Sequence, residues 1–305
     1  MSFTSPVQPA REPGPESGRE PGPESGRKPG PESGREPGQE PAREPGEWAP
    51  AHALPRPEDR PGPGEVAVWL LRIPPSAAAA ATAVAEGMLD ERERERAARL
   101  RSEVARERYV TSHVGLRTLL GGYLGTDPAE VEFTRETCGM PDCDKPHGRP
   151  ALAGEDTLHF SLSHSGDAAL CAVAGVPVGA DIEERDPRRA GARLAGLIDQ
   201  LHPGERAAIG ALPEALREEA FLGCWVRKEA YLKGIGTGLP GGLAAHHVGL
   251  ADGLAPADAP PGPSGWAFAD LDAPSGYYAA VAVRDESAPG DPARPAVTLA
   301  GLRLG

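Results

Sequence analysis

Short apolar runs bounded by glycine, proline and polar residues recur along the chain from residue 66 onward. Runs of this length and setting are typical of β-strands. They predict strands at residues 66–73, 130–134, 158–162, 168–174, 178–183, 246–250, 265–270 and 277–284. The residues Gly175-Val176-Pro177 predict a tight hairpin turn between two of these strands.

Apolar residues at three- and four-residue spacing, which is typical of helices, separate the strands into groups. They predict helices at residues 76–88, in the arginine-rich stretch from residue 92, and at 109–124, 190–199, 203–210 and 214–233. Strands interrupted by groups of helices, followed by the same order again, indicate an α+β architecture with two similar α/β halves.

The first part of the chain carries a repeat in place of a hydrophobic pattern. Residues 11–46 are built from the octet Arg-Glu-Pro-Gly-Pro-Glu-Ser-Gly, which starts at residues 11, 19 and 27, with Lys28 in place of Glu in the third copy, and decays after 35. A structural array of repeats needs an apolar face to stack, and this octet has none. The sequence therefore predicts a disordered Pro/Gly/Glu tail over residues 1–62, an N-terminal half over 63–176 and a C-terminal half over 177–305.

Charge and composition narrow the class of protein. The formal net charge of −13 argues against a nucleic-acid partner. Arginines concentrate between Arg92 and Arg117, but glutamates interleave with them, and this pattern predicts a solvated helix whose charges pair with each other. The chain has no apolar run long enough to span a bilayer and no signal-peptide pattern. We therefore expect no membrane association and a cytoplasmic location, which the four cysteines of the chain also fit.

A compact group of potential zinc ligands lies at Cys138, Cys143 and His147. A structural zinc site needs four good ligands, and no fourth one stands at metal-binding spacing. The sequence therefore argues against zinc.

A different metal is indicated by the strand predicted at residues 178–183. Side chains alternate along a strand, so Asp181 and Glu183 share one face while Val178, Ala180 and Ile182 point into a core. Two adjacent carboxylates repel each other unless a cation joins them. Mg²⁺ prefers one or two carboxylates together with water and phosphate oxygens, so a magnesium or manganese site is expected here.

A second polar group lies on the helix predicted at residues 214–233. Glu229 and Lys233 are one turn apart, at the edge of its apolar stripe. An ordinary solvated Glu-Lys pair would have the same spacing. At an edge position, however, the carboxylate is partly buried and still reaches a neighbouring site.

Together the two runs resemble the paired signatures of the 4′-phosphopantetheinyl transferases, G-x-D-x-E and W-x-x-K-E-A-x-x-K, which are complete at Gly179–Glu183 and Trp225–Lys233. Three upstream segments are similar to further motifs of that family. These are Arg108-Tyr109 with Leu116-Arg117-Thr118-Leu119-Leu120, Arg149-Pro150-Ala151-Leu152 with Arg in place of the usual Lys, and Phe160–Asp167. The resemblance runs from about residue 66 to residue 283.

The resemblance implies a single-chain pseudo-dimer that acts as a monomer, with its active site between the halves. It also implies transfer of the 4′-phosphopantetheine group from coenzyme A to a serine of an acyl, polyketide or peptidyl carrier protein, with release of adenosine 3′,5′-bisphosphate. Two other functions fit the same residues. One is an enzyme that cleaves a related diphosphate, and the other is a non-catalytic module that binds coenzyme A or a carrier protein.

Each site residue receives an expected role. Asp181, Glu183 and Glu229 hold the metal ion, and Glu229 is also the candidate general base for the serine proton. Lys233 neutralises or protonates the leaving phosphate, and His164 donates to the phosphates of coenzyme A, although a histidine here could equally be a core residue. The other residues expected to contact the coenzyme are Arg117, Arg149, Pro150, Ser163 and Lys228.

Overall fold

The computed structural model describes residues 53–138, 140, 148–187, 192–239, 242–257, 260, 262–285 and 294–304. They form a mixed α/β fold, which confirms the expected α+β class. The strands are β1 (Glu65–Arg72), β2 (Phe133–Arg135), β3 (Pro150–Leu152), β4 (His159–Ser165), β5 (Ala168–Ala174), β6 (Val178–Glu184), β7 (Trp266–Leu271), β8 (Tyr277–Arg284) and β9 (Ala296–Leu302). The helices are α1 (Pro75–Met88), α2 (Glu91–Ala98), α3 (Glu103–Leu124), α4 (Ala192–Ile198), α5 (Pro203–Ala211) and α6 (Glu214–Gly234), with short 3₁₀ helices η1 (Pro57–Asp59) and η2 (Pro128–Glu130).

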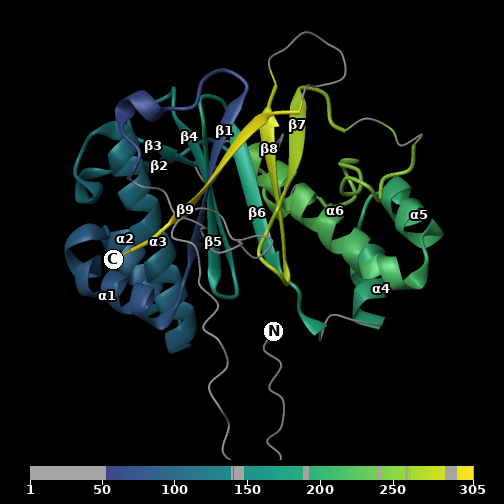
Figure 1. Ribbon diagram of the computed structural model, residues 1–305, viewed down its shortest axis with the longest axis horizontal. Helices are drawn as coiled ribbons and strands as arrows, with labels where there is room; N and C mark the ends of the chain where they lie inside the picture. Colours follow the sequence, from purple (N-terminus) through teal and green to yellow (C-terminus); the bar gives the residue numbers. More distant parts are fainter. Residues whose placement is uncertain are drawn as a thin grey trace, which may run out of the picture. The chain divides into compact units, whose positions relative to one another are not determined.

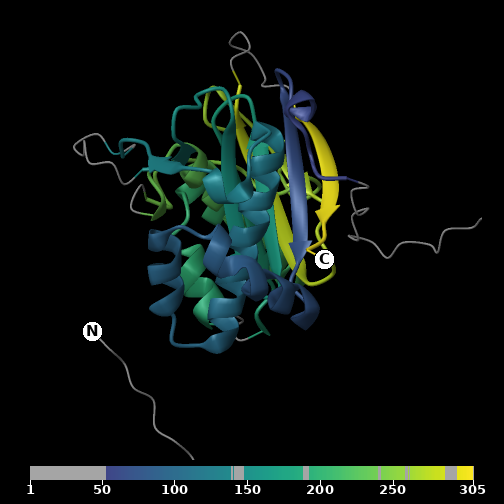
Figure 2. The ribbon, with the colours of Figure 1, turned by 90° about the vertical axis from the view of Figure 1, so that its left-hand side faces the viewer.

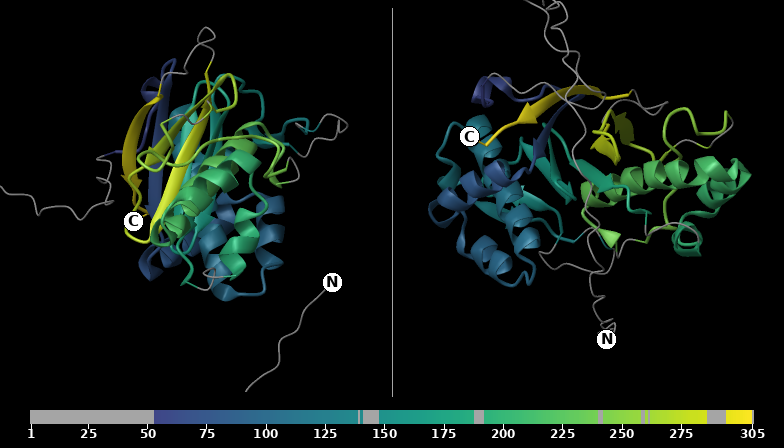
Figure 3. Two further views of the ribbon diagram at one scale, coloured as in Figure 1. Left: turned by 90° about the vertical axis from the view of Figure 1, so that its right-hand side faces the viewer. Right: turned by 60° about the horizontal axis from the view of Figure 1, so that its bottom comes forward.

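Two sheets pack face to face between two groups of helices. The first sheet has the strand order β4-β5-β1-β9 and the second has the order β6-β8-β7. Helices α1, α2 and α3 cover the outer side of the first sheet, and α6 crosses the outer side of the second (Figures 1, 2 and 3). Strands β2 and β3 form a separate small sheet.

The nearly continuous apolar sequence of β1 follows from its position in the middle of these layers. Val68 and Leu70 belong to the core cluster between the two sheets, whereas Trp69 and Leu71 belong to the cluster beneath α3. Side chains alternate across a strand, so a strand covered on both faces is apolar at nearly every position. A third core cluster joins α6 to Trp266 and Ala282 of the second sheet.

Each principal sheet therefore carries one long helix, α3 or α6. The expected division at residues 176 and 177 stays a prediction, and the chain changes sheets there, between β5 and β6. Strand β9 was not predicted from the sequence. It pairs in parallel with β1, so the end of the expected C-terminal half joins the sheet of the N-terminal half (Figure 1).

The predicted hairpin at Gly175-Val176-Pro177 was wrong. Strand β5 pairs with β4 and β1, whereas β6 pairs with β8 in the other sheet. Glycine and proline set the shape of a connection, but distant strands decide which edge each strand joins. The residues of this turn therefore connect two sheets.

The structure corrects two other element predictions. No strand forms at residues 246–250, where Val248 and Leu250 are instead buried against α6 and the Val248 amide donates to a Glu205 carboxylate oxygen. Helix α3 begins at residue 103, six residues before the expected start, because the Ser102 hydroxyl accepts from the Ala105 amide and caps it.

The residues just before β1 are packed, although the sequence placed residues 53–62 in the tail. Arg60 donates to the Tyr123 carbonyl at 3.2 Å and to Glu155 at 3.0 Å. The Pro55 carbonyl lies so close to Gly122 that a β-carbon there would sit 2.3 Å from it.

Among the described helices, none combines the length and apolar character that a bilayer crossing requires.

Candidate active site

The signature carboxylates and lysine meet where β6 packs against β4 and α6. The Lys233 ammonium nitrogen lies 2.6 Å from Asp181 Oδ1, 2.8 Å from Ser163 Oγ and 3.2 Å from the Ala180 carbonyl oxygen. Ser163 Oγ in turn donates to Asp181 Oδ1 at 2.7 Å. Residues from β4, β6 and α6, far apart in the sequence, thus form one connected polar group.

Two glycines allow α6 to approach β6 this closely. A β-carbon on Gly179 would lie 1.8 Å from the Ala230 carbonyl oxygen, and one on Gly234 would lie 2.6 Å from the Trp266 ring. Contacts this short are sterically forbidden, so only glycine fits at the crossing point. The first glycine of the G-x-D-x-E signature therefore sets the separation between the carboxylates of β6 and the side chains of α6.

Glu229 lies one helical turn before Lys233 and is partly buried. Burial raises the pKa of its carboxyl from 4.5 to about 7, and the negative charges of Asp181 and Glu183 add to the rise while Lys233 opposes it. The charges of Asp181 and Glu183 are thus near enough to Glu229 to disfavour its ionised form. Glu229 thus has the proton affinity that a general base needs near neutral pH.

The donor types fit a hard divalent cation. Asp181 is buried, and its Oδ2 atom has no hydrogen-bond partner among the described residues, which is unusual for a buried carboxylate oxygen. Oxygen ligands from carboxylates are those that Mg²⁺ and Mn²⁺ take. In the part of the chain that the structure describes, however, no three His, Cys, Asp or Glu side chains are already gathered as a metal-binding group. Lys233 is the cation that Asp181 Oδ1 contacts here.

His164, near the end of β4, lies beside this group and is exposed to solvent. Partial loss of hydration lowers the pKa of its imidazole, and the positive charges of Lys233 and Arg108 lower it further. Arg108, at the start of α3, forms an ion pair with Asp167 at 2.7 Å. Lys233 and Arg108, one from each expected half, are thus near enough to His164 to disfavour its protonated form.

Comparison with known proteins places these residues in a family. A family model of the 4′-phosphopantetheinyl transferase superfamily matches residues 177–282, the stretch that carries Asp181, Glu183, Glu229 and Lys233. Residues 177–282 of this chain thus carry the sequence pattern of the 4′-phosphopantetheinyl transferase superfamily.

Three relatives in this superfamily show the extent of the similarity. The chain is 35% identical to the 4′-phosphopantetheinyl transferase HetI of Nostoc sp. over 139 residues, 44% of this chain and 54% of that protein. It is 33% identical to a phosphopantetheinyl transferase of Thraustochytrium sp. over 192 residues, 59% of this chain and 64% of that protein. It is 30% identical to a 4′-phosphopantetheinyl transferase of Bacillus subtilis over 140 residues, 45% of this chain and 59% of that protein. The chain thus spans between about half and two thirds of the length of these curated relatives.

Lys228, inside the superfamily signature on α6, points away from this group. Its ammonium is buried and pairs with the buried Glu205 carboxylate at 2.8 Å, and it also donates to the His246 carbonyl. Glu205 further accepts from the Val248 and His202 amides. In this structure the charge of Lys228 holds α6 to α5 and to the segment that follows α6, and the expected contact with coenzyme A stays a prediction.

Arg117 is likewise committed to the protein interior. Its side chain is 1% exposed and donates to Glu93, to Asp90 and to the carbonyls of Pro128 and Val131. These partners occupy the donors that a nucleotide phosphate would need. In this structure Arg117 ties α3 to α2 and η2, and the expected nucleotide contact of Arg117 stays a prediction.

Arg149 and Pro150 lie at the start of β3. The Arg149 guanidinium is buried, pairs with Glu136 and lies 3.1 Å from His159 Nδ1, while its Nη1 atom has no partner among the described residues. Pro150 is exposed. Gly236, just past the end of α6, has a φ of 77°, and a β-carbon there would lie 3.3 Å from the Arg149 amide nitrogen. A coenzyme contact at Arg149 and Pro150 stays a prediction.

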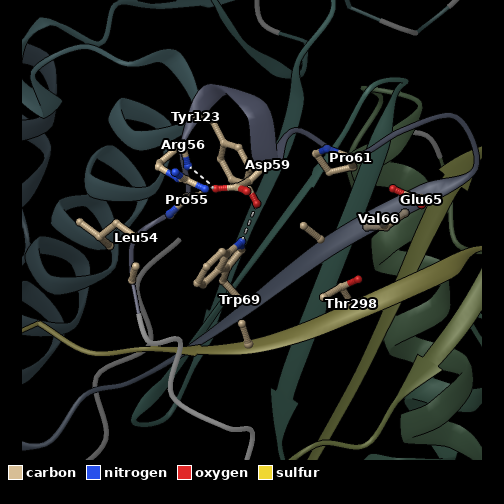
Figure 4. A pocket seen from close by; sticks show the side chains of 13 residues that line it. Leu54, Pro55, Arg56, Asp59, Pro61, Glu65, Val66, Trp69, Tyr123 and Thr298 are labelled. Atoms are coloured by element: carbon tan, nitrogen blue, oxygen red, sulfur yellow. Dashed lines mark hydrogen bonds and ion pairs between the residues drawn. The ribbon is translucent and has the colours of Figure 1, made fainter.

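Of the three residues weighed as zinc ligands, Cys143 and His147 lie outside the described residues, and Cys138 is buried and not in a disulfide. A cavity of about 520 Å³ lies elsewhere, between the segment before β1 and strands β1 and β9 (Figure 4). Trp69, which donates to the Tyr123 hydroxyl, lines it. None of the signature residues lines this cavity, so it is separate from the candidate active site.

Sequence reasoning missed two residues of this region. Ser161 and Ser165 point to the same side of β4 as Ser163 and also contact β6. The signal was their period-two spacing, which places all three hydroxyls on one face.

Proposed function

We propose that this protein transfers the 4′-phosphopantetheine group from coenzyme A to a serine hydroxyl of an apo acyl, polyketide or peptidyl carrier protein. The products are the holo carrier protein and adenosine 3′,5′-bisphosphate. The observation that carries the proposal is the connected group of Ser163, Asp181 and Lys233 beside Glu229, at the junction of β4, β6 and α6.

In this reaction the serine oxygen forms a bond to the phosphorus that carries the pantetheine. The bond from that phosphorus to the oxygen bridging the diphosphate breaks, and the bridging oxygen leaves with the adenosine 3′,5′-bisphosphate. Negative charge develops on the phosphoryl oxygens and on the leaving group. Catalysis of phosphoryl transfer consists mainly of positioning and of neutralising this charge.

Glu229 accepts the proton of the attacking serine. In the protein without its metal ion, a pKa of about 7 leaves much of this carboxylate ionised at neutral pH while keeping its affinity for a proton high.

Lys233 and His164 act on the phosphates of coenzyme A. The Lys233 ammonium is about one third exposed, so it can reach a phosphate from its place beside Asp181. His164, set among Lys233 and Arg108, donates a hydrogen bond to the phosphates of coenzyme A.

Asp181, Glu183 and Glu229 would hold Mg²⁺ or Mn²⁺. When bound, the cation neutralises charge on the diphosphate. Because β4 belongs to one expected half and β6 and α6 to the other, a single chain supplies every residue of the site. This supports action as a monomer, and we propose a cytoplasmic location on the basis of composition.

An intact-mass assay tests the proposal. An apo carrier protein incubated with this protein, coenzyme A and Mg²⁺ should gain one phosphopantetheine mass, and a chelator should prevent the gain. Cleavage of coenzyme A without a mass gain on acyl or peptidyl carriers would favour the diphosphate-cleaving alternative. Binding without cleavage would favour a non-catalytic module.

A further inference from the structure

The edge of β6 that faces β4 is joined to β4 by side chains. The two principal sheets end at β4 and at β6 respectively, with no backbone pairing between these strands. Three hydroxyls of β4, which we call the serine row (Ser161, Ser163 and Ser165), span the junction instead. Alternation along the strand points all three toward β6.

The three contacts of the serine row differ in kind. Ser161 Oγ accepts from the Ala180 amide at 3.0 Å, so it contacts backbone. Ser163 Oγ contacts Asp181 and Lys233, as described above. Ser165 Oγ accepts from the Glu184 amide at 3.0 Å and donates to Glu183 Oε2 at 3.1 Å.

We infer that Ser165 is a positioning residue for the Glu183 carboxylate, an inference that rests on the proposed function. A hydroxyl has one proton, and an amide donor already occupies one of the lone pairs of Ser165, so its proton is directed toward Glu183. The same oxygen therefore fixes the strand beside Glu183 and the orientation of the Glu183 side chain. Hydrogen bonds to metal ligands orient those ligands, and removing them typically costs 10- to 100-fold in metal affinity.

The chain offers a matched control in Ser161. It lies on the same strand and the same face and contacts the same edge of β6, but no carboxylate. Loss of either hydroxyl weakens the junction of the sheets, whereas only loss of Ser165 removes a contact with a proposed metal ligand.

The test is a Mn²⁺ titration followed by electron paramagnetic resonance, with coenzyme A present, on the wild type, Ser165→Ala, Ser161→Ala and Ser165→Thr. We expect Ser165→Ala to weaken Mn²⁺ affinity roughly 10- to 100-fold. Ser161→Ala should stay within about twofold of the wild type, since a structural change alone moves only thermal stability. Ser165→Thr, which retains the hydroxyl, should restore affinity.

Equal Mn²⁺ affinity in Ser165→Ala and Ser161→Ala would overturn the inference, as would a wild type that binds no Mn²⁺. Should Ser165→Ala fail to fold, Ser165→Cys keeps nearly the same size with a much weaker donor, and unchanged affinity there would also overturn it. Wild-type transfer to a carrier protein, measured in parallel, separates the two claims. If the wild type transfers and the Mn²⁺ affinity of Ser165→Ala is unchanged, only the role of Ser165 is refuted. If the wild type does not transfer, the proposed function is refuted.

Discussion

At the scale of single residues, the geometry of the site depends on the lack of a side chain at Gly179 as much as on the charged residues near it. The missing β-carbon lets the Ala230 carbonyl of α6 lie against β6. Lys233 and Glu229, on the same helix, thereby come within range of Asp181. The G-x-D-x-E signature therefore encodes a packing distance together with two carboxylates.

Gly179→Ala should destabilise the protein because the new methyl group would overlap the Ala230 carbonyl oxygen. We expect a loss of about 1–3 kcal/mol or more in the free energy of unfolding, measured by urea denaturation. The matched control is Gly87→Ala in α1, where a β-carbon meets no atom within 4 Å. That substitution should be neutral or stabilise by up to about 1 kcal/mol. Equal effects of the two substitutions would refute the close approach.

The raised pKa of Glu229 leads to a prediction about the pH dependence of stability in the metal-free protein. Its carboxyl has a pKa of about 7 in the folded state against 4.5 ordinarily, so the folded protein holds a proton that the unfolded chain has released. The stability contributed by this protonation is complete below pH 4.5 and is lost as pH rises through about 7. Between roughly pH 5 and pH 8, urea midpoints should therefore fall more in the wild type than in Glu229→Gln. Parallel pH profiles would show that the pKa of Glu229 is not raised.

At the scale of elements, one side of α6 contributes Glu229 and Lys233 to the site, and another side binds α5 through Lys228. Lys228 precedes Glu229 by one residue and points to a different side of the helix, where it pairs with Glu205. This buried ion pair connects α6 with α5, and through the Val248 amide with the segment after α6. The orientation of Glu229 thus depends on a contact outside the site.

Lys228→Met should strongly destabilise the protein, because it leaves the Glu205 carboxylate buried without its cation. Removing one partner of a buried ion pair costs roughly 3–5 kcal/mol. The double variant Lys228→Met/Glu205→Gln should be less destabilised than Lys228→Met, because no unpaired charge remains. A double-mutant cycle by urea denaturation measures the difference. Simple additivity of the two substitutions would contradict a direct interaction.

The sequence predicted elements best where burial is decided locally. Strand β5 forms at the predicted residues, and β4, β6 and α6 form within a few residues of prediction. Strand β9 was missed because it pairs in parallel with β1, more than two hundred residues away in the sequence. The buried ion pairs of Lys228 and Arg117 could not be predicted from the sequence either. A charged residue can bind a ligand or a buried partner, and segments distant in the sequence decide which of these it contacts.

At the scale of the whole molecule, the packed part of the chain begins earlier than its composition suggests. Residues 53–62 contact α3 through the Pro55 carbonyl and Arg60. Composition shows where apolar residues become frequent. It cannot predict that a proline-rich segment is ordered when backbone and ionic contacts hold that segment in place.

Removing residues 1–52 should leave the melting temperature unchanged, since this tract lacks the apolar residues of a core. Removing residues 1–61 should lower it, because Arg60 loses its contacts with Tyr123 and Glu155. Differential scanning calorimetry of the two truncated proteins measures both effects. Equal melting temperatures would show that residues 53–61 contribute nothing to stability.

The most direct test of the central claim is transfer by site variants, measured by intact mass of an apo carrier protein with coenzyme A and Mg²⁺. Asp181→Asn keeps the size of the side chain and an acceptor for Lys233 but removes the charge. It should reduce the transfer rate by roughly 100-fold or more. Glu184→Gln, an exposed neighbour on the same strand, is the control and should transfer like the wild type. Full transfer by Asp181→Asn would contradict an active site at the junction of β4, β6 and α6.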